Sequence, residues 1–329
     1  MATPKTSLLT GASGFVGANL ARRLLRDGHK VHLLVRKGHA TWRLNDISAH
    51  CAIHEIDLLD FEQLSNVIAK IKPDWIFHLA ANGAYSWQND FDQIVATNFT
   101  ATVNLVRACL ATEFGAFVNT GSSSEYGLKD HPPGEEEGLE PNSHYAAAKA
   151  SATIFCKHLA AANKVHIPTL RLYSVYGSWE EPNRLMPAMI VHGLNKQLPP
   201  LVDKDIARDY IYIDDVLDAY IAAAETETDE PGAVYNVGTG VQTSIGEVVE
   251  IARSLLDIDE QPQWGSMPNR KWDTTVWVSN NRKLQERLGW RPEHNFKQGF
   301  AEFVDWFKSD KKIRQYYESK LESFAGSRL

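Results

Sequence analysis

This sequence of 329 residues has few cysteines, no long apolar run and no excess of positive charge. The three cysteines, Cys51, Cys109 and Cys156, are widely spaced, which argues against a disulfide framework or a zinc site. No apolar run approaches the length that crosses a membrane. The net charge of −7 gives no support for a nucleic-acid partner. We therefore expect a protein with no membrane or nucleic-acid partner and no metal centre.

The N-terminal residues also lack the apolar stretch of a secretory signal, since 1–5 lead directly into a strand-like segment. Together with the scattered cysteines, this favours a cytoplasmic location. Because the chain is acidic overall, it would have to bind an anionic substrate through a few local arginines rather than through its whole surface.

The first half of the chain alternates short apolar runs with segments of helical periodicity. Strands are expected at 7–10, 30–35, 52–56, 75–81, 116–120 and 168–176, and helices at 15–27, 61–71 and 94–110. This alternation predicts an α/β fold of the Rossmann type, a doubly wound parallel sheet with helices on both faces. Ligands of such sheets bind beyond the carboxyl ends of the strands.

The second half is less regular and predicts a smaller, mixed α/β lobe that binds substrate. We expect 1–177, with about 208–236, to form the dinucleotide-binding domain, and about 178–207 and 237–329 to form the lobe. Asp214 and Asp215 are expected to cap a helix that begins at Val216. The acidic run 135–137 is expected to be a solvated loop.

A glycine-rich turn, G-x-x-G-x-x-G, follows the first strand. Glycines at this spacing allow a sharp turn and a close approach of the backbone to a pyrophosphate. The next helix would present free N–H groups and its positive dipole end to that anion. An ordinary strand-to-helix turn is the alternative, but the position between a strand and a helix favours a dinucleotide site. Its residues would be Gly11, Ser13, Gly14, Phe15, Val16 and Gly17.

The second strand ends in Val35-Arg36-Lys37, where dinucleotide folds often place an acid for the adenosine ribose. The missing acid and the added arginine favour a ribose 2′-phosphate and hence NADP(H). Both charges can also be solvated, which leaves NAD possible. Asp57, after the third strand, would either hydrogen-bond the adenine or cap the next helix.

Tyr145 and Lys149 lie four residues apart, so a helix would carry them on one face. The ammonium is expected to lower the phenol pKa from about 10, so that Tyr145 gives or takes a proton near neutral pH. Lys149 can also hydrogen-bond a nicotinamide ribose. Such pairs occur on many helices. The serine-rich segment 121–127, just after the fifth strand, would add a hydroxyl for the substrate oxygen or be an ordinary loop.

In their order along nearly the whole chain, these elements resemble the extended short-chain dehydrogenase/reductase family. The resemblance is strongest to its NAD(P)-dependent nucleotide-sugar epimerases, dehydratases and ketoreductases. The matching segments are 11–17, 78–81, Asn98, 121–127, 145–149, 171–177, 208–216, 236–238 and 288–292. The resemblance implies a nucleotide-diphosphate sugar as substrate and a homodimer that pairs through two long helices, here about 94–110 and 145–159.

The resemblance also implies roles for individual residues. Tyr145 would be the acid/base, Lys149 its partner and Ser122 the third catalytic member, with Ser123 as the alternative. Further cofactor contacts would come from Arg36, Asp57, Leu58, Leu79, Ala80, Ala81, Asn98, Thr120, Tyr145, Lys149, Tyr173 and Val175. Substrate contacts would come from Tyr85, Ser124, Ser174, Arg184, Arg208 and Arg270, although Arg208 can instead pair with Asp209.

Departures from the family pattern narrow the reaction. The 4,6-dehydratases need an acid after the catalytic Ser or Thr, but Ser123 and Ser124 stand there, so dehydration would require Glu125 to swing into the site. The Arg36-Lys37 pair then favours an NADPH-consuming reductase of a 4-keto-6-deoxy sugar nucleotide. The alternative is a redox-neutral 4-epimerase with tightly bound NAD. A non-catalytic module that senses NADP(H) is more remote, because Tyr145 and Lys149 occur together.

Overall fold

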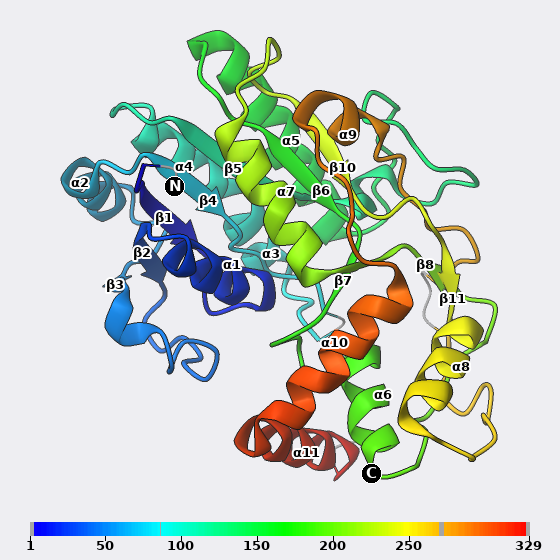
Figure 1. Cartoon of the computed structure of the whole chain (residues 1–329). Coiled ribbons are helices and arrows are strands. Elements are labelled where there is room, and N and C mark those ends of the chain that lie inside the picture. The colour runs from blue at the N-terminus through cyan, green and yellow to red at the C-terminus, as the bar shows by residue number, and fades with distance from the viewer. Residues whose placement is uncertain (1–2, 86, 270–272, 327–329) are drawn as a thin grey trace.

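The computed structural model, which describes residues 3–85, 87–269 and 273–326, is built on a seven-stranded parallel sheet (Figure 1). Its strands are β1 (Thr6–Thr10), β2 (Lys30–Val35), β3 (Ala52–Glu55), β4 (Trp75–His78), β5 (Ala116–Ser122), β6 (Thr169–Leu172) and β10 (Val234–Val237). Their order is β10-β6-β5-β4-β1-β2-β3, so the chain builds outwards from β1 on one side and from β4 on the other. The predicted doubly wound Rossmann sheet is confirmed.

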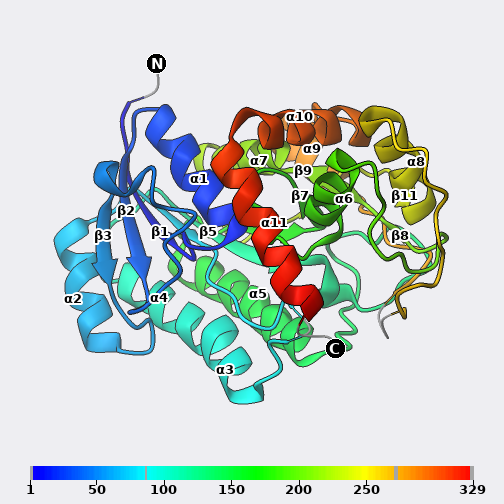
Figure 2. The same ribbon diagram turned by 90° about the horizontal axis from the view of Figure 1, so that it is seen from below.

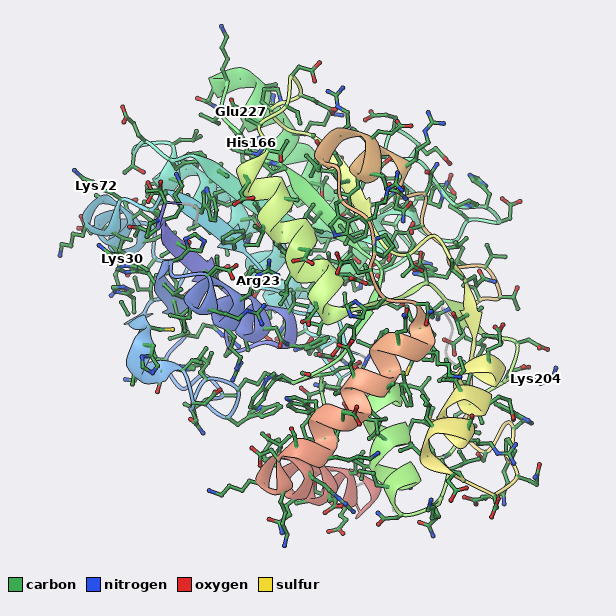
Figure 3. All side chains as sticks on the ribbon, in the orientation of Figure 1. Arg23, Lys30, Lys72, His166, Lys204 and Glu227 are labelled. Carbon is green, nitrogen blue, oxygen red and sulfur yellow. The ribbon has the colours of Figure 1, made fainter. Side chains whose placement is uncertain are left out.

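Helices cover both faces of this sheet (Figure 2). The first face carries α1 (Phe15–Arg26) and α7 (Ile213–Glu225), and the second carries α2 (Phe61–Ile71), α4 (Ala101–Cys109) and α5 (His144–Asn163). Arg23 lies on α1 (Figure 3), where it forms an ion pair with Asp218 of α7. None of the helices in the described ranges combines the length and the apolarity that crossing a bilayer requires.

Alternate residues of each central strand enter different hydrophobic clusters, because successive side chains of a strand point to opposite faces. Leu8 of β1 and Ile76 of β4 are fully buried in the cluster that includes α2 and α4. Their neighbours Leu9 and Phe77 are fully buried in the cluster that includes α1 and α7. Burial on both faces explains why these strands are almost continuously apolar.

A C-terminal lobe packs beside the sheet. It contains α6 (Leu185–Leu194), α8 (Ile245–Leu256), α10 (Phe296–Ser309) and α11 (Lys311–Gly326), while α9 (Arg282–Leu288) packs against β10. Two small strand pairs join these parts: β7 (Ser174–Tyr176) with β9 (Tyr210–Tyr212), and β8 (Ala207–Arg208) with β11 (Thr243–Ser244). The strand predicted for 168–176 is therefore divided at Tyr173. Its first part stays in the central sheet, and its second part leads the chain into the lobe.

The helix α7 begins at Ile213 rather than at Val216, and its N-cap residue is Tyr212. The prediction that Asp214 and Asp215 cap this helix was wrong, because both lie inside its first turn and no side chain caps it. Asp215 is buried and accepts hydrogen bonds from the Glu293 N–H (3.0 Å), the His294 N–H (3.2 Å) and His294 Nδ1 (2.9 Å). Asp215 thus fastens the segment before α10 to the sheet domain.

Replacing Asp215 with alanine should lower the free energy of unfolding by roughly 3 kcal/mol, because three donors around 293–294 lose their acceptor. Urea unfolding of the wild type and the variant measures this change. Asp214→Ala is the matched control, since it removes the neighbouring carboxylate and leaves these bonds intact. Equal decreases in the free energy of unfolding for the two variants would contradict the role assigned to Asp215.

The bond between His294 and Asp215 should also make stability depend on pH. Burial lowers the pKa of His294, but the hydrogen bond and the charge of Asp215 outweigh burial and leave the pKa above its usual value. A raised folded-state pKa stabilises the protein below the unfolded pKa, and this contribution disappears as the pH rises through the folded pKa. The stability difference between wild type and His294→Gln should therefore be larger at about pH 5.5 than at about pH 9. An equal difference at both pH values would refute this linkage.

Candidate active site

The glycine turn lies where the carboxyl ends of β1 and β4 meet. Gly11 has a φ of +71°, and a Cβ on it would come within 2.5 Å of the Leu79 carbonyl carbon. A Cβ on Gly17 would lie 2.4 Å from the carbonyl oxygen of Gly11. Both positions therefore require glycine, and the turn is held tightly against the neighbouring strand.

The start of α1 leaves donors available for a ligand. Gly14 is the N-cap residue, so no side chain caps the helix, and its first turn contains no acid. A Cβ on Gly14 would meet only the carbonyl oxygen of Gly11, at 3.2 Å. Backbone N–H groups at an uncapped helix start, together with the helix dipole, suit a dinucleotide pyrophosphate. These residues therefore fit the cofactor that the sequence predicts.

The outer part of the predicted cofactor site contains both exposed charges and structural contacts. Arg36 is exposed directly after β2. Asp57 is also exposed, and its carboxylate accepts from the Leu59 N–H at 2.9 Å. The suggestion that Asp57 caps the next helix was wrong, because Asp60 caps α2 by accepting from the Gln63 N–H at 3.0 Å. The Leu58 carbonyl accepts from Asn104 at 3.1 Å.

The loop after β4 is fixed by buried polar side chains. Asn98 lies in η2 (Ala96–Thr100), a π-helical turn between α3 (Phe91–Val95) and α4. Its amide donates to the Asn82 carbonyl (2.6 Å) and accepts from the Asn82 N–H (3.1 Å). Asn98 thus holds the loop that follows Leu79, Ala80 and Ala81 through protein contacts. Such π-turns frequently occur at functional sites.

His78 at the end of β4 is a structural residue. Its two ring nitrogens contact the hydroxyls of Thr10 (2.7 Å) and Thr102 (2.8 Å). Burial, with a smaller effect of Lys149, lowers the pKa of His78 to about 3, so the ring is neutral at physiological pH. It therefore fastens β4 to β1 and α4.

Tyr145, Lys149, Ser122 and Thr120 come together beside the end of β5. Tyr145 lies in the first turn of α5, which Ser143 caps by accepting from the Ala146 N–H at 3.1 Å. The Ser122 side chain lies close enough to Tyr145 to lower the pKa of the phenol. Lys149 is buried, and its ammonium donates to the Thr120 carbonyl at 2.5 Å. The predicted catalytic residues therefore share one site, at the carboxyl edge of the sheet.

The acidity of this group differs from the prediction. Burial raises the pKa of Tyr145 to about 12, and the nearby Ser122 side chain opposes this rise only in part. Burial also lowers the pKa of Lys149 to about 8. The expected lowering of the phenol pKa by Lys149 was wrong for the protein alone, because burial dominates and the ammonium donates to Thr120.

The serine loop distinguishes Ser122 from its neighbours. Ser122 contacts Tyr145, and its Oγ lies 2.5 Å from Ser124 Oγ and accepts from the Ser124 N–H at 3.2 Å. Ser123 instead lines a cavity together with Tyr173 and Trp277. The geometry therefore favours Ser122 over Ser123 as the partner of Tyr145.

Glu125 is not available as a catalytic acid. Its side chain is fully buried in η3 (Ser123–Tyr126), and Oε2 accepts from Arg171 Nε at 2.8 Å. Oε1 accepts from the Ser122 N–H (2.8 Å) and from Thr153 Oγ1 (3.1 Å). A carboxylate held by these three donors cannot swing toward a substrate without breaking a buried ion pair.

The acidic run 135–137 is not simply a solvated loop. Glu136 and Glu137 are exposed, but Glu135 is partly buried and accepts from the Asn236 N–H at 2.9 Å. Burial raises the pKa of Glu135. This loop is therefore packed against β10.

The predicted substrate residues lie in two groups. Arg184 lies 5.9 Å from the ring centre of Tyr85 and forms an ion pair with Glu180 (3.7 Å). Arg208 pairs with Asp273 (3.0 Å), and not with Asp209. Asp209 is buried and accepts instead from Thr239, Gly240 and Ser279. Ser174 and Val175 lie in β7, and Arg270 is outside the described residues.

One connection at the cofactor site was missed by the sequence analysis. Arg43 lies in an irregular segment, yet its side chain is almost completely buried. It donates to the carbonyls of Ser13 (3.3 Å) and Trp179 (2.7 Å) and pairs with Glu181 (3.0 Å). Arg43 therefore ties the glycine turn to the segment between β7 and α6. Only its neighbour in sequence, Trp42, hinted at a packed environment.

Replacing Gly17 with alanine should weaken dinucleotide binding by at least about tenfold, because the new Cβ would displace Gly11 and misalign the start of α1. Gly138→Ala is the matched control, since no atom lies within 4 Å of its added Cβ. Titration of the purified proteins with the dinucleotide measures both effects. Undiminished binding by the Gly17 variant would rule out the turn as the pyrophosphate site.

Comparisons with known proteins agree with this arrangement. UDP-glucose 4-epimerase from Mycolicibacterium smegmatis is 30% identical, over 92% of this chain and 98% of that protein. A trifunctional UDP-glucose 4,6-dehydratase/3,5-epimerase/reductase from Arabidopsis thaliana is 26% identical over 93% of this chain, which spans 47% of that protein.

The crystal structure of UDP-glucuronic acid 4-epimerase from Bacillus cereus, in complex with UDP-glucuronic acid and NAD, is also similar. It superposes with a TM-score of 0.81 at 26% identity, covering 92% of this chain and 99% of that one. Residues 7–238 match the sequence model of the NAD-dependent epimerase/dehydratase family. The chain is therefore an enzyme that belongs to the NAD-dependent epimerase/dehydratase family, within the extended short-chain dehydrogenase/reductases.

Proposed function

We propose that this enzyme is a redox-neutral 4-epimerase of a UDP-activated hexose that retains NAD through the reaction. The observation that carries the proposal is the grouping of Ser122, Tyr145 and Lys149 beside a Glu125 that is locked in an ion pair. This grouping supplies groups for proton transfer but leaves Glu125 unable to expel water, which argues against dehydration. The similar epimerases named above support the same choice.

The residues of the site suit the transfer of one proton in each direction. Tyr145 would remove the proton from the sugar 4-hydroxyl and return it after the ring has turned, and Ser122 would hold the same oxygen. When bound, oxidised NAD would supply the hydride acceptor and a positive charge. Lys149 is held beside these residues at the Thr120 carbonyl, from where it would hydrogen-bond the nicotinamide ribose.

The substrate would lie across the boundary between the sheet and the C-terminal lobe. Arg184 and Arg208 are near enough for the charge of Arg184 to lower the pKa of Arg208, although burial contributes more. Two neighbouring guanidinium groups suit a diphosphate, because each can form paired hydrogen bonds to its oxygens. Tyr85 interacts electrostatically with both Arg184 and Tyr145. A position near both residues suits a contact with the sugar ring.

The sequence favoured a reductase that uses NADPH, and the relatives do not support that preference. The Bacillus cereus structure contains NAD. Arg36 is exposed, as a solvated charge would be. Its position after β2 still favours a reductase as the second candidate, because an exposed guanidinium there can bind a 2′-phosphate.

Incubation of the purified enzyme with UDP-glucose, UDP-glucuronic acid and UDP-N-acetylglucosamine should convert at least one into its 4-epimer without added cofactor. The released cofactor of the denatured protein should be NAD. Parallel reactions with NADH or NADPH and 4-keto sugar nucleotides test the reductase. Turnover only in the presence of NADPH, with its stoichiometric oxidation, would reject the epimerase and support the reductase.

Tyr145→Phe should lower kcat by about 10²- to 10⁴-fold, because the proton at the sugar oxygen loses its carrier. The binding of UDP-sugar should change little, since the ring remains in place. Tyr235→Phe, in the edge strand β10, is the control and should leave kcat unchanged. Full activity of the Tyr145 variant would remove this residue from the mechanism.

A further inference from the structure

The carboxylate of Glu125 is joined to the backbone of the serine that contacts Tyr145. Ser122 is the N-cap residue of η3, and Glu125 is the third residue of that turn. The Glu125 side chain accepts from the Ser122 N–H, while the Ser122 hydroxyl accepts from the Ser124 N–H. This reciprocal capping arrangement fixes both the backbone and the hydroxyl of Ser122.

We propose that Glu125 is a positioning residue for the proposed epimerase reaction, in which its carboxylate holds Ser122 in the orientation that presents the serine hydroxyl to Tyr145. The inference rests on the proposed function. Glu125 itself touches neither reacting atom. It acts through the Ser122 N–H, at 2.8 Å.

The surroundings of Glu125 allow only one position for its carboxylate. Arg171 of β6 and Thr153 of α5 approach it from two other elements, and all three groups are nearly completely buried. A Cβ on Gly121 would lie 2.7 Å from Glu125 Oε1 and 3.1 Å from Arg171 Cγ. The absence of a side chain at residue 121 therefore makes room for the ion pair.

Arg171 is itself fixed by a second group of contacts. Its Nη1 donates to the Tyr126 hydroxyl (2.8 Å) and to the Glu135 carbonyl (3.2 Å). The Tyr126 hydroxyl in turn donates to Asn236 Oδ1 of β10 (2.8 Å). These contacts hold Arg171 against β10 and the 133–137 loop, whereas the Glu125–Ser122 bond itself does not pass through them.

A fixed serine matters because its hydroxyl has several competing partners. Ser122 Oγ contacts Ser124 Oγ at 2.5 Å, the Ser124 N–H at 3.2 Å and the Tyr145 phenol. A small rotation of the turn would keep the contacts to Ser124, which would move with it, and would break the contact to Tyr145. A misplacement of about 1 Å can lower a rate by about 10²-fold.

Two variants of Glu125 separate its contacts. Glu125→Val removes every acceptor, whereas Glu125→Gln keeps one oxygen that can accept from the Ser122 N–H. We expect kcat to fall by about 10²-fold in the valine variant and by a smaller factor in the glutamine variant. The KM for the UDP-sugar should change less than about threefold in both, since neither variant removes a substrate contact.

Tyr126→Phe is the matched control. It removes two hydrogen bonds from the same buried network but leaves the Glu125–Ser122 bond in place. Its thermal midpoint should fall while kcat stays near the wild-type value. A valine variant that keeps wild-type kcat would overturn the proposal. So would a fall in the kcat of Tyr126→Phe that accompanies its fall in stability, because a loss of stability alone would then explain the effect of Glu125 on kcat.

A second measurement does not depend on the valine variant folding. In the glutamine variant, reduction of the bound cofactor by substrate, followed in a single turnover by absorbance, should slow in proportion to kcat. An unchanged rate of this step would contradict the proposal. If the wild type proves to reduce a keto sugar, the proposed function fails, but the same kcat comparison on that reaction still tests Glu125.

Discussion

The close contact between Gly11 and Leu79 is the constraint on which the arrangement of the site depends. A Cβ at residue 11 would be 2.5 Å from the Leu79 carbonyl carbon, so the ends of β1 and β4 can approach this closely only through glycine. The order in which the chain adds strands to the sheet reverses between these two strands. The contact places the start of α1 at the edge of the sheet where β1 and β4 end. This position is two strands away from β5, which carries Ser122.

Burial is the main influence on the chemistry of the residues at this edge of the sheet. It raises the pKa of Tyr145 to about 12, so the phenol is neutral near neutral pH in the protein alone, and it lowers the pKa of Lys149 to about 8. Proton transfer near neutral pH therefore requires charge that arrives with the ligands.

The sequence was sufficient for the parts of the molecule that depend on local pattern. Apolar strands, helical periodicity and the glycine spacing predicted six strands of the sheet and the position of the turn, but not β10. The division of 168–176 at Tyr173 could not be predicted, because the two halves pair with different strands, β5 and β10 for the first and β9 for the second. Pairing between strands that are far apart in the sequence cannot be inferred from the local pattern of residues.

The sequence indicated which residues gather at the proposed site, but not which distant residues they or their neighbours contact. Tyr145, Lys149 and Ser122 meet as their positions suggested, whereas Glu125 pairs with Arg171, which is 46 residues away. Asp215 likewise contacts residues almost 80 positions later, at His294. The direction of the Tyr145 pKa shift also required the structure, because it depends on burial, and sequence spacing contains no measure of burial.

In the proposed reaction, hydride leaves the sugar and returns to the same carbon within one enzyme molecule. The most direct test uses the accepted UDP-hexose with deuterium at C4, in ordinary water and without added cofactor. We expect a 4-epimer that retains the deuterium at C4. Loss of the label to solvent, or turnover only when NADPH is added and consumed, would contradict it.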